Sequence, residues 1–480
     1  MRRGLIGGAV ALALAVPAAA QAFTPNDPFV PRQWYATQDK AFDAFNVLPL
    51  LPQVRVAVID TGVDATHPDL KGRIVAARSF VGGSPSDDQG HGTFVAGEIA
   101  AGIDDGHGMA GLAASARLLI AKVVRPDGSV STRAEARAIR WAVRRGARII
   151  NISLGGLRDP QDPTFTGYSV VEAQAVNYAI ANGVLVVAAV GNNNYAPVKP
   201  WNYAGYPAAL PHVVGTGSYG RSGDVSRFSN RDQVYVDLEA PGEDMFSLLP
   251  RPVTERYSNC PEQGYSSCGP KDYRHAAGTS FSAPQVTAAA ATLFGLQPSL
   301  TPDQVSWLLE RATTDATPAN GCDACANGRD SLTGWGRLNI AAAVRTVRLG
   351  QEPVADRFEP DDDIVLGSPV HGRRDRIRAT IDYWDDSVDV YRIKLRRGQR
   401  VSVVSHTGPD LDISLVLWKP ALTTLSDARD ALRVRRSIHG PGVPERLRYR
   451  AAKTGWYSLE VTAAKPGFGP YKLKIKRSAS

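Results

Sequence analysis

Hydrophobic residues between positions 54 and 190 gather into short, almost uninterrupted runs. The runs are VRVAVI (54–59), RLLIAKVV (117–124), ARIINISL (147–154) and GVLVVAAV (183–190). Strands covered on both faces have such continuous apolar runs, whereas half-exposed strands alternate apolar and polar residues. We therefore predict strands that are buried on both faces of one sheet.

Helical patterns separate these runs. TRAEARAIRWAVRRG (132–146) and SVVEAQAVNYAIANG (169–183) have helical spacing and end in Gly146 and Gly183, a common residue just past a helix. GTFVAGEIAAGI (92–103) and QVTAAAATLFGL (285–296) are further predicted helices. The alternation of strand and helix predicts an α/β fold with a doubly wound, mostly parallel sheet.

The pattern changes after residue 347. EPVADRFEPDDD (352–363) has the polar composition of a linker, and alternating stretches such as DISLVLW (412–418) and GPYKLKIKR (469–477) follow it. Period-two alternation predicts a C-terminal antiparallel β-sandwich domain. The predicted domains are an α/β domain at 23–347, a linker at 348–365 and the sandwich at 366–480.

The N-terminus looks like a secretory signal peptide over residues 1–22. Arg2 and Arg3 precede the apolar run LIGGAVALALAV, and AQA (20–22) offers small residues for cleavage. The alternative is a buried first helix. No later stretch approaches about twenty uninterrupted apolar residues, the length that a membrane-spanning helix needs. We expect a secreted monomer, extracellular or periplasmic, without stable membrane insertion.

Charge and cysteine content narrow the partners and the compartment. The net charge is +8, and residues 351–480 carry 24 Lys and Arg against 17 Asp and Glu. These basic residues look scattered through the alternating strands, which favours a solvated surface, so no nucleic-acid partner is expected. Four cysteines fit an oxidising compartment and allow three pairings, of which we favour Cys260–Cys268 with Cys322–Cys325. A zinc site would need histidines and short paired spacings that are missing here.

Ser280 lies in GTSFSAP (278–284), among residues with little side chain. Small neighbours such as Gly278 and Ala283 let backbone approach a reacting carbonyl, but a serine hydroxyl needs a base to act as a nucleophile. Among eight histidines, His91 stands out because two glycines bracket it at the start of a predicted helix. Asp60 ends a buried strand, at the sheet edge where open α/β sheets bind ligands.

Together, DTG (60–62), HGT (91–93) and GTS (278–280) resemble the motifs of the subtilase family of serine proteases, in the order Asp, His, Ser. DTG also occurs in aspartic proteases, but those need two copies and this chain has one. The resemblance covers about residues 24–345. It implies that Ser280 is the nucleophile, that His91 is the general base and then acid, and that Asp60 orients the imidazole. It also implies that Asn192 and the Ser280 N–H form an oxyanion hole.

The resemblance implies a substrate site as well. An edge that pairs with the substrate backbone would be formed by Ser153, Leu154 and Gly155. A pocket for the side chain before the cut would be formed by Ala188, Ala189, Val190 and Gly191.

TPNDPFVPRQW (24–34) resembles the start of thermitase-like members, which implies a structural calcium ion. Its ligands would be carboxylates of Asp27, Asp69 and Asp105 with carbonyls of Gly102, His107 and Met109, a donor set that suits a hard cation. Each Asp taken alone also fits a helix cap or a surface charge.

Three departures from the family pattern stand out. The predicted signal peptide runs straight into a mature-like start, although the family usually has a pro-segment. Phe94 and Phe281 stand where histidine and methionine are common, which affects pocket shape. The C-terminal stretches resemble the bacterial pre-peptidase C-terminal domain.

These features together predict a secreted serine endopeptidase that cleaves protein or peptide substrates through an acyl-enzyme. One alternative is a non-catalytic secreted binding protein on the same fold, which the complete set of motif residues disfavours. Another is a maturation protease of narrow specificity. Acidic clusters beside the pocket would favour the latter, and residues 152–156 and 188–192 contain none.

Overall fold

The computed structural model describes residues 22–162, 167–193, 196–257 and 267–478. Residues 1–21 of the predicted signal peptide lie outside this part. Within the described residues, no helix combines the length and the apolar character needed to cross a membrane.

A seven-stranded sheet, parallel throughout, forms the centre of the N-terminal unit. The four predicted strands are neighbours inside the sheet, β6 is a fifth inner strand, and β2 and β7 are the edge strands. In spatial order the strands are β2 (Ile74–Ser79), β3 (Ala116–Lys122), β1 (Val54–Asp60), β4 (Ile149–Ile152), β5 (Leu185–Ala189), β6 (Val213–Tyr219) and β7 (Leu238–Pro241).

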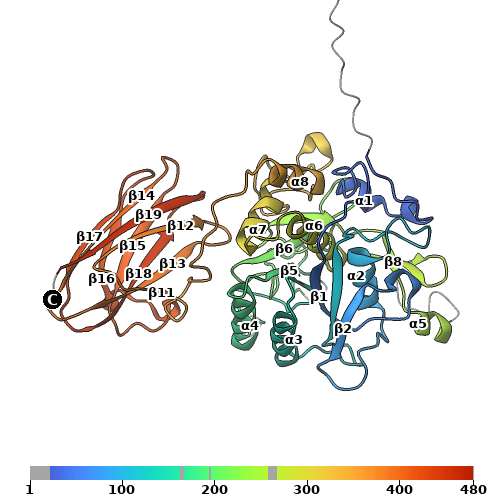
Figure 1. Cartoon of the computed structure of the whole chain (residues 1–480), viewed down its shortest axis with the longest axis horizontal. Helices are drawn as coiled ribbons and strands as arrows, with labels where there is room; N and C mark the ends of the chain where they lie inside the picture. Colours follow the sequence, from blue (N-terminus) through green and yellow to red (C-terminus); the bar gives the residue numbers. More distant parts are fainter. Residues whose placement is uncertain (1–21, 163–166, 194–195, 258–266, 479–480) are drawn as a thin grey trace, which may run out of the picture.

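Successive residues of each central strand enter two different cores, as the continuous apolar runs require. Val56 and Val58 of β1 pack on one side, and Ala57 and Ile59 pack on the other. Helices α2 (His91–Ala100), α6 (Ala283–Leu296), α7 (Pro302–Arg311) and α8 (Ile340–Arg348) cover the first face. Helices α3 (Thr132–Arg144) and α4 (Val170–Ile180) lie side by side on the second (Figure 1). The sheet is therefore doubly wound.

Smaller elements flank this sheet. A three-stranded sheet in the order β8 (Met245–Leu248), β10 (Tyr273–Ala276), β9 (Ser267–Cys268) lies against α2, and the remaining helices are α1 (Trp34–Gln38) and α5 (Arg251–Arg256). Cys322 and Cys325 form the predicted local disulfide. Cys260 lies outside the described residues, so its pairing with Cys268 stays a prediction.

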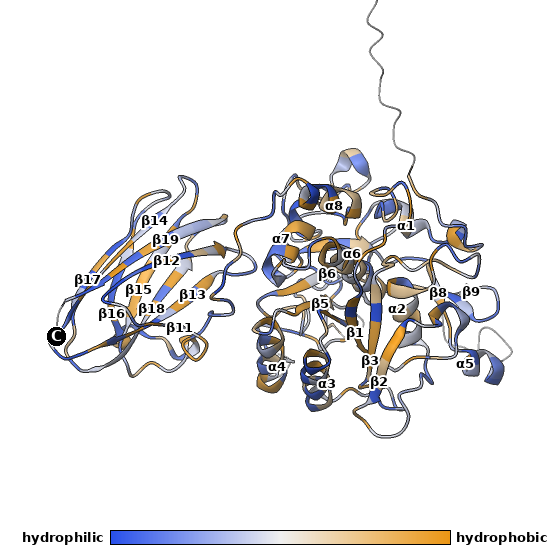
Figure 2. Cartoon of the chain, viewed as in Figure 1, coloured by the Kyte–Doolittle hydropathy of each residue, from blue (hydrophilic) through white to orange (hydrophobic). Residues whose placement is uncertain are grey.

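The C-terminal unit is a β-sandwich, as the alternation predicts. One sheet has the order β11 (Ser368–Val370), β13 (Val388–Leu395), β18 (Gly455–Ala463), β15 (Ile413–Trp418), β16 (Arg433–Ile438). The other has the order β12 (Arg374–Asp382), β19 (Phe468–Arg477), β14 (Arg400–Thr407), β17 (Arg446–Arg450). Pairing is antiparallel except between β11 and β13. Figure 2 shows hydrophilic and hydrophobic residues alternating along these strands.

Direct contacts join the two units, including contacts from the segment predicted as a linker. His212 is buried, and its ring Nδ1 is hydrogen-bonded to Asp303 Oδ1 at 3.0 Å. The other ring nitrogen, Nε2, is hydrogen-bonded to Asp362 Oδ2 at 3.1 Å. Arg311 Nη2 donates to Asp382 Oδ2 at 2.7 Å. Burial lowers the pKa of His212, but the surrounding carboxylates outweigh burial and raise that pKa well above 6.5. We call this set of contacts the junction.

Candidate active site

Strand β1 and helix α2 bring Asp60 and His91 together. Asp60 is the last residue of β1 and is fully buried, while His91 is the first residue of α2. His91 Nδ1 and Asp60 Oδ1 are 2.8 Å apart, and the Thr61 N–H donates to the same oxygen at 2.7 Å. The His91 side chain is 25% exposed, so the ring is anchored on one side and open to solvent on the other.

Burial and charge act in opposite directions on His91. Burial lowers the pKa of the ring, whereas the charge of Asp60, its hydrogen bond and the charge of Asp87 raise it. The charges prevail, and the pKa of His91 lies above its ordinary value of 6.5. The imidazole can accept a proton only in its neutral form, so the raised pKa moves the pH range in which it can act as a base upward.

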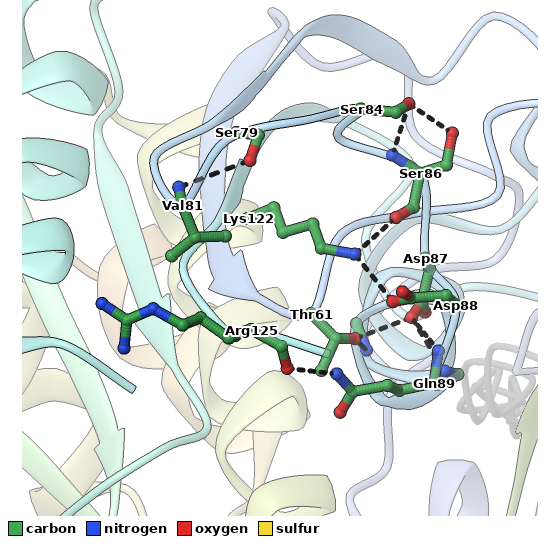
Figure 3. A network of polar contacts seen from close by, with 12 residues as sticks. Thr61, Ser79, Val81, Ser84, Ser86, Asp87, Asp88, Gln89, Lys122 and Arg125 are labelled. Carbon is green, nitrogen blue, oxygen red and sulfur yellow. Dashed lines mark hydrogen bonds and ion pairs between the residues drawn. The ribbon is translucent and has the colours of Figure 1, made fainter. Parts of the chain in front are cut away.

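Asp87 organises the approach to His91, and sequence reasoning missed it. Its Oδ1 accepts hydrogen bonds from the Thr61 hydroxyl at 2.9 Å and from the Gln89 N–H at 3.1 Å (Figure 3). Its Oδ2 accepts from the N–H and the hydroxyl of Thr93. Asp87 is thus a positioning residue that ties the loop before α2 to the end of β1. An acid four residues before His91 was the available signal.

Lys122, at the end of β3, holds the outer side of this loop. Its Nζ donates to Asp88 Oδ1 at 2.7 Å and to the Ser86 carbonyl at 2.9 Å (Figure 3). The Lys122 side chain is 6% exposed, whereas its partner Asp88 is 41% exposed, so the lysine is buried and the carboxylate faces solvent. The loop before His91 is therefore fixed from both β1 and β3.

Ser280 lies in a 3-10 turn, Thr279–Phe281, that leads into α6. Gly278 precedes the turn at φ +152°, and a Cβ there would come within 3.3 Å of Asn192 Nδ2. The close approach accounts for the glycine. Ser280 Oγ donates to the Ser153 carbonyl at 3.0 Å, and the described residues include no hydrogen bond between Ser280 and His91.

A chain of hydrogen bonds that starts on α6 and passes through the end of β4 holds the Ser280 turn in position. Thr287 of α6 donates to Asn151 Oδ1 at 2.9 Å, and Asn151 Nδ2 donates to Ser153 Oγ at 2.9 Å. Ser153 Oγ then donates to the Ser280 carbonyl at 2.7 Å. Ser153 thus contacts Ser280 through both its carbonyl and its hydroxyl.

The orientation of the Asn192 amide is fixed. Asn192 Oδ1 accepts from the Thr279 N–H at 2.9 Å and from the Thr279 hydroxyl at 2.8 Å. These donors leave Asn192 Nδ2 as a donor next to Gly278, close to the Ser280 turn. A preorganised N–H donor beside a nucleophile is suited to stabilising developing negative charge on an oxygen.

A hollow of about 160 Å³ opens beside Ser280 and Asn192. Six of the seven residues predicted to bind substrate line it, namely Ser153, Leu154, Gly155, Ala189, Val190 and Gly191. Ala188 does not line the hollow, because it is fully buried in β5 and packs in the core beneath it.

Asn230 also lines this hollow, and nothing in the sequence singled it out. Its Nδ2 donates to the Val190 carbonyl at 3.0 Å, and its Oδ1 accepts from the Asn193 N–H at 2.8 Å. Gly191 between them has φ +103°, and a Cβ there would lie 2.6 Å from Asn230 Nδ2. Asn230 therefore fixes the loop that carries Asn192.

The two aromatic departures from the family pattern contact each other. The ring centroids of Phe94 and Phe281 lie 4.4 Å apart, and the Phe281 ring is 5.3 Å from the His91 ring. Both side chains are buried. One aromatic residue fills space next to the other, so the two departures form one packing unit beside the base.

The predicted calcium ligands gather on the loop 102–109. Asp27 accepts from the N–H groups of Asp104 and Asp105, and Asp69 accepts from the Met109 N–H at 3.0 Å. Asp105 Oδ1 accepts from the His107 N–H, and His107 Nε2 is 3.4 Å from Asp69 Oδ1. Burial raises the pKa of Asp69, so a nearby cation would stabilise its charged form.

These oxygen donors suit calcium chemically, and in this structure the carboxylates accept hydrogen bonds from backbone amides and, at Asp69, from the Tyr273 hydroxyl. The tight groups of three or more metal-capable side chains in the described residues lie elsewhere, around the junction. They are His212, Glu359, Asp362 and Asp386; Asp237, Glu310 and Asp385; and Asp356, Glu359 and Asp389.

Comparisons with known proteins identify relatives of this chain. The chain is 33% identical over 340 residues to the cell wall-associated protease of Bacillus subtilis (strain 168). This match covers 66% of the chain and 33% of that protein. The chain is also 36% identical over 232 residues to thermitase of Thermoactinomyces vulgaris, a match that covers 48% of this chain and 77% of thermitase. The chain thus spans a third of the first relative's length.

A solved protease structure from Pseudoalteromonas arctica PAMC 21717 superimposes with a TM-score of 0.54 at 27% identity. The match covers 68% of this chain and 99% of that one. Residues 52–336, which contain Asp60, His91, Asn192 and Ser280, match the subtilase family. With the family match extending over more than half of its length, the chain belongs to the subtilase family.

Proposed function

We propose that this protein is a serine endopeptidase that cleaves peptide bonds through an acyl-enzyme intermediate. The observation that carries the proposal is a hollow lined by Ser280 and Asn192. Next to the same turn, the His91 ring is hydrogen-bonded to Asp60 and lies 5.3 Å from the ring of Phe281, the residue after Ser280. In the proposed reaction, Ser280 Oγ attacks the substrate carbonyl while His91 Nε2 takes the hydroxyl proton. The C–N bond then breaks, and His91 returns the proton to the departing amine.

The second half of the reaction reverses these roles for water. His91 removes a proton from water, hydroxide adds to the acyl carbonyl, and Ser280 leaves with the proton as a hydroxyl group. In both halves the carbonyl oxygen gains negative charge, which Asn192 Nδ2 and the Ser280 N–H would stabilise. The first step requires Ser280 Oγ to rotate from the Ser153 carbonyl toward His91.

The lining of the hollow supports a preference for uncharged side chains. Its lining residues are Ser, Thr, Asn, Gly, Ala, Val and Leu, without an ionisable side chain. The glycines Gly155, Gly156 and Gly205 leave room for backbone to approach. A substrate held as an extended strand along Ser153–Gly155 would place one side chain in the hollow.

A digest of a peptide library with mass-spectrometric mapping of the cuts tests this proposal. We expect many cuts, mostly after uncharged side chains of small or medium size. A narrow maturation protease would cut at one motif only, and a non-catalytic binding protein would give no cuts. A preference for charged residues before the cut would contradict the proposed role of the hollow.

Domain organisation and location belong to the same proposal. The end of α8 at Arg348 and the start of β11 at Ser368 support boundaries at 23–347, 348–365 and 366–480. The predicted signal peptide supports secretion after its removal.

The pH dependence of the reaction should reflect the raised pKa of His91. The base must be neutral to accept a proton, so kcat/KM should fall as pH decreases through a pKa above 6.5. The profile is measured on a peptide amide without titratable side chains, so that only the enzyme titrates. An acid limb with its midpoint below 6.5 would contradict this arrangement of His91 and Asp60.

We also propose that a calcium ion binds the loop 102–109 with Asp27, Asp69 and Asp105, and ties the N-terminal arm to the body. Removing calcium should lower the melting temperature, since an ion at a hundredfold excess over its Kd adds about 2.7 kcal/mol of stability. Thermal unfolding of the Ser280→Ala protein with EDTA and with excess calcium measures the effect without self-digestion. Asp69→Asn should abolish the difference, and superimposable curves for the parent would rule out the site.

A further inference from the structure

Ten basic side chains lie on one face of the four-stranded sheet. Strand residues two apart point the same way, and the register aligns those on neighbouring strands. Arg374 is opposite Lys476, Lys476 is opposite Ser402, and Ser402 is opposite Arg448. The ten, all exposed, are Arg374, Arg376, Arg378, Arg400, Arg446, Arg448, Arg450, Lys472, Lys474 and Lys476, and we call them the basic face.

The basic face corrects the expectation that these residues are scattered. Among the ten, the other positions of the same phase are Ser402, Val404 and His406. Toward the junction this phase continues with Thr380, Asp382, Phe468 and Pro470, and the one carboxylate among them, Asp382, is buried and paired with Arg311. None of the ten side chains forms an ion pair within the described part of the chain. Their positive charge is therefore available to a partner.

This arrangement costs stability. Arg374 with Lys476, Arg376 with Lys474, Arg378 with Lys472 and Arg400 with Arg450 are like charges directly opposite each other. Such pairs destabilise a sheet. The four pairs do not stabilise the free protein, whereas a bound polyanion would offset the charge repulsion in all four.

At one end, the basic face is hollowed. The hollow is about 1000 Å³ and is lined by basic side chains of all four strands, among them Arg374, Arg400, Arg448, Arg450 and Lys476. Neighbouring strands lie about 4.8 Å apart, so the hollow offers a row of cations across roughly 14 Å. Arginine, the main residue of this row, binds carboxylate, sulfate and phosphate groups with two hydrogen bonds at a time.

The chemistry of the face favours an extended anionic polymer over other polyanions. Single-stranded nucleic acid is usually held by exposed aromatic side chains that stack on bases. Here the aromatic rings near the row pack against other rings: Tyr449, which lines the hollow, against Tyr457, and Phe468 against Trp307. Stable attachment to a membrane surface usually needs apolar groups that insert. Among the basic residues the one apolar position of this phase is Val404, and Phe468 and Pro470 lie beyond them, toward the junction. A chain of acidic sugars needs neither feature and fits a recessed row of cations.

We propose that the basic face binds a linear anionic polysaccharide, with acidic groups of successive sugars seated in the hollow between β12 and β17. This binding does not depend on the proposed peptidase reaction, because the basic face and the Ser280 site belong to different units. The interaction is electrostatic, so it should weaken steeply as salt concentration rises.

The test measures affinity of the full chain, in the Ser280→Ala background, for heparin and polygalacturonate, with neutral dextran as the uncharged control. Reversing three charges on the basic face (Arg376→Glu, Arg448→Glu, Lys474→Glu) should weaken binding on the order of 100-fold at low salt. The matched control reverses three exposed charges elsewhere on the same unit, Arg396→Glu, Arg435→Glu and Arg436→Glu, and should bind like the parent.

Double-stranded DNA and phosphatidylglycerol vesicles complete the comparison. If the parent bound DNA or the vesicles more tightly than both polysaccharides, the proposed partner would be wrong. If both triple variants lost the same amount of affinity, the binding site would not be the basic face. No binding of the parent to either polysaccharide would also overturn the proposal. Should the glutamate variant unfold in a melting experiment, the matching glutamine variant, which removes charge without reversing it, should still lose at least about tenfold.

Discussion

Replacing Ser280 by alanine should lower the hydrolysis of a peptide substrate by about six orders of magnitude while the protein stays folded. In the proposed reaction the Ser280 hydroxyl forms the acyl bond, whereas the neighbouring hydroxyls of Ser153 and Thr279 donate to the Ser280 carbonyl and to Asn192 Oδ1. Alanine keeps the backbone carbonyl that accepts from Ser153 Oγ, so the turn before α6 should persist. Turnover of casein and labelling by a fluorophosphonate probe measure the effect, and melting temperature measures the fold.

Ser282 provides the matched control for this substitution. It lies two residues further on, is fully buried, and donates to the carbonyls of Ala240 and Pro241 at 3.0 Å. Ser282→Ala should reduce stability by about 1 kcal/mol and leave probe labelling intact. Labelling that survives in Ser280→Ala, or disappears in Ser282→Ala while the protein remains folded, would assign the nucleophile to another residue.

Replacing Asn192 by alanine should lower kcat by about 10²–10³ with little change in KM, because a donor of this kind acts mainly on the charge of the transition state. Thr279 holds Asn192 Oδ1 with two hydrogen bonds, which leaves Asn192 Nδ2 next to Gly278, beside the Ser280 turn. Steady-state kinetics on a peptide substrate separate the two constants. A change confined to KM would assign Asn192 to substrate binding.

Asn230 separates a chemical effect from a structural one. It contacts Val190 and Asn193 and so shapes both the hollow and the loop of Asn192. Asn230→Ala should therefore raise KM as well as lower kcat. If Asn192→Ala showed the same paired change, its effect would be structural and the oxyanion role would be refuted.

Local signals in the sequence predicted much of the fold and the site. Continuous apolar runs identified the central strands because both faces of a parallel strand are buried, and glycines marked the ends of α3 and α4. The candidate residues around Ser280 came from short motifs. Each motif sits at an element boundary, and the predicted strand 54–59 placed Asp60 at the ligand-binding edge of the sheet. The grouping of His91 and Ser280 with Asp60 came from the resemblance to the subtilase family.

Features that depend on distant segments could not be predicted in this way. Asn230 acts on a loop that lies about forty residues earlier, and no local pattern marks it. Alternation predicted the strands of the sandwich. It did not predict which alternate residues of one strand share a face of the sheet with which alternate residues of the neighbouring strand. Only the register between β12, β19, β14 and β17 shows that the basic residues share a face.

The junction determines the reach of the catalytic site. A catalytic unit joined to its binding unit by a flexible tether would sweep a volume set by the length of that tether. Here His212, Arg311 and their partners on Asp362 and Asp382 hold the two units directly against each other. A molecule seated on a polymer through its C-terminal unit would therefore present the Ser280 hollow at one height and in one direction. It would cleave proteins in a thin layer at that distance and spare those lying closer to the polymer or beyond the layer.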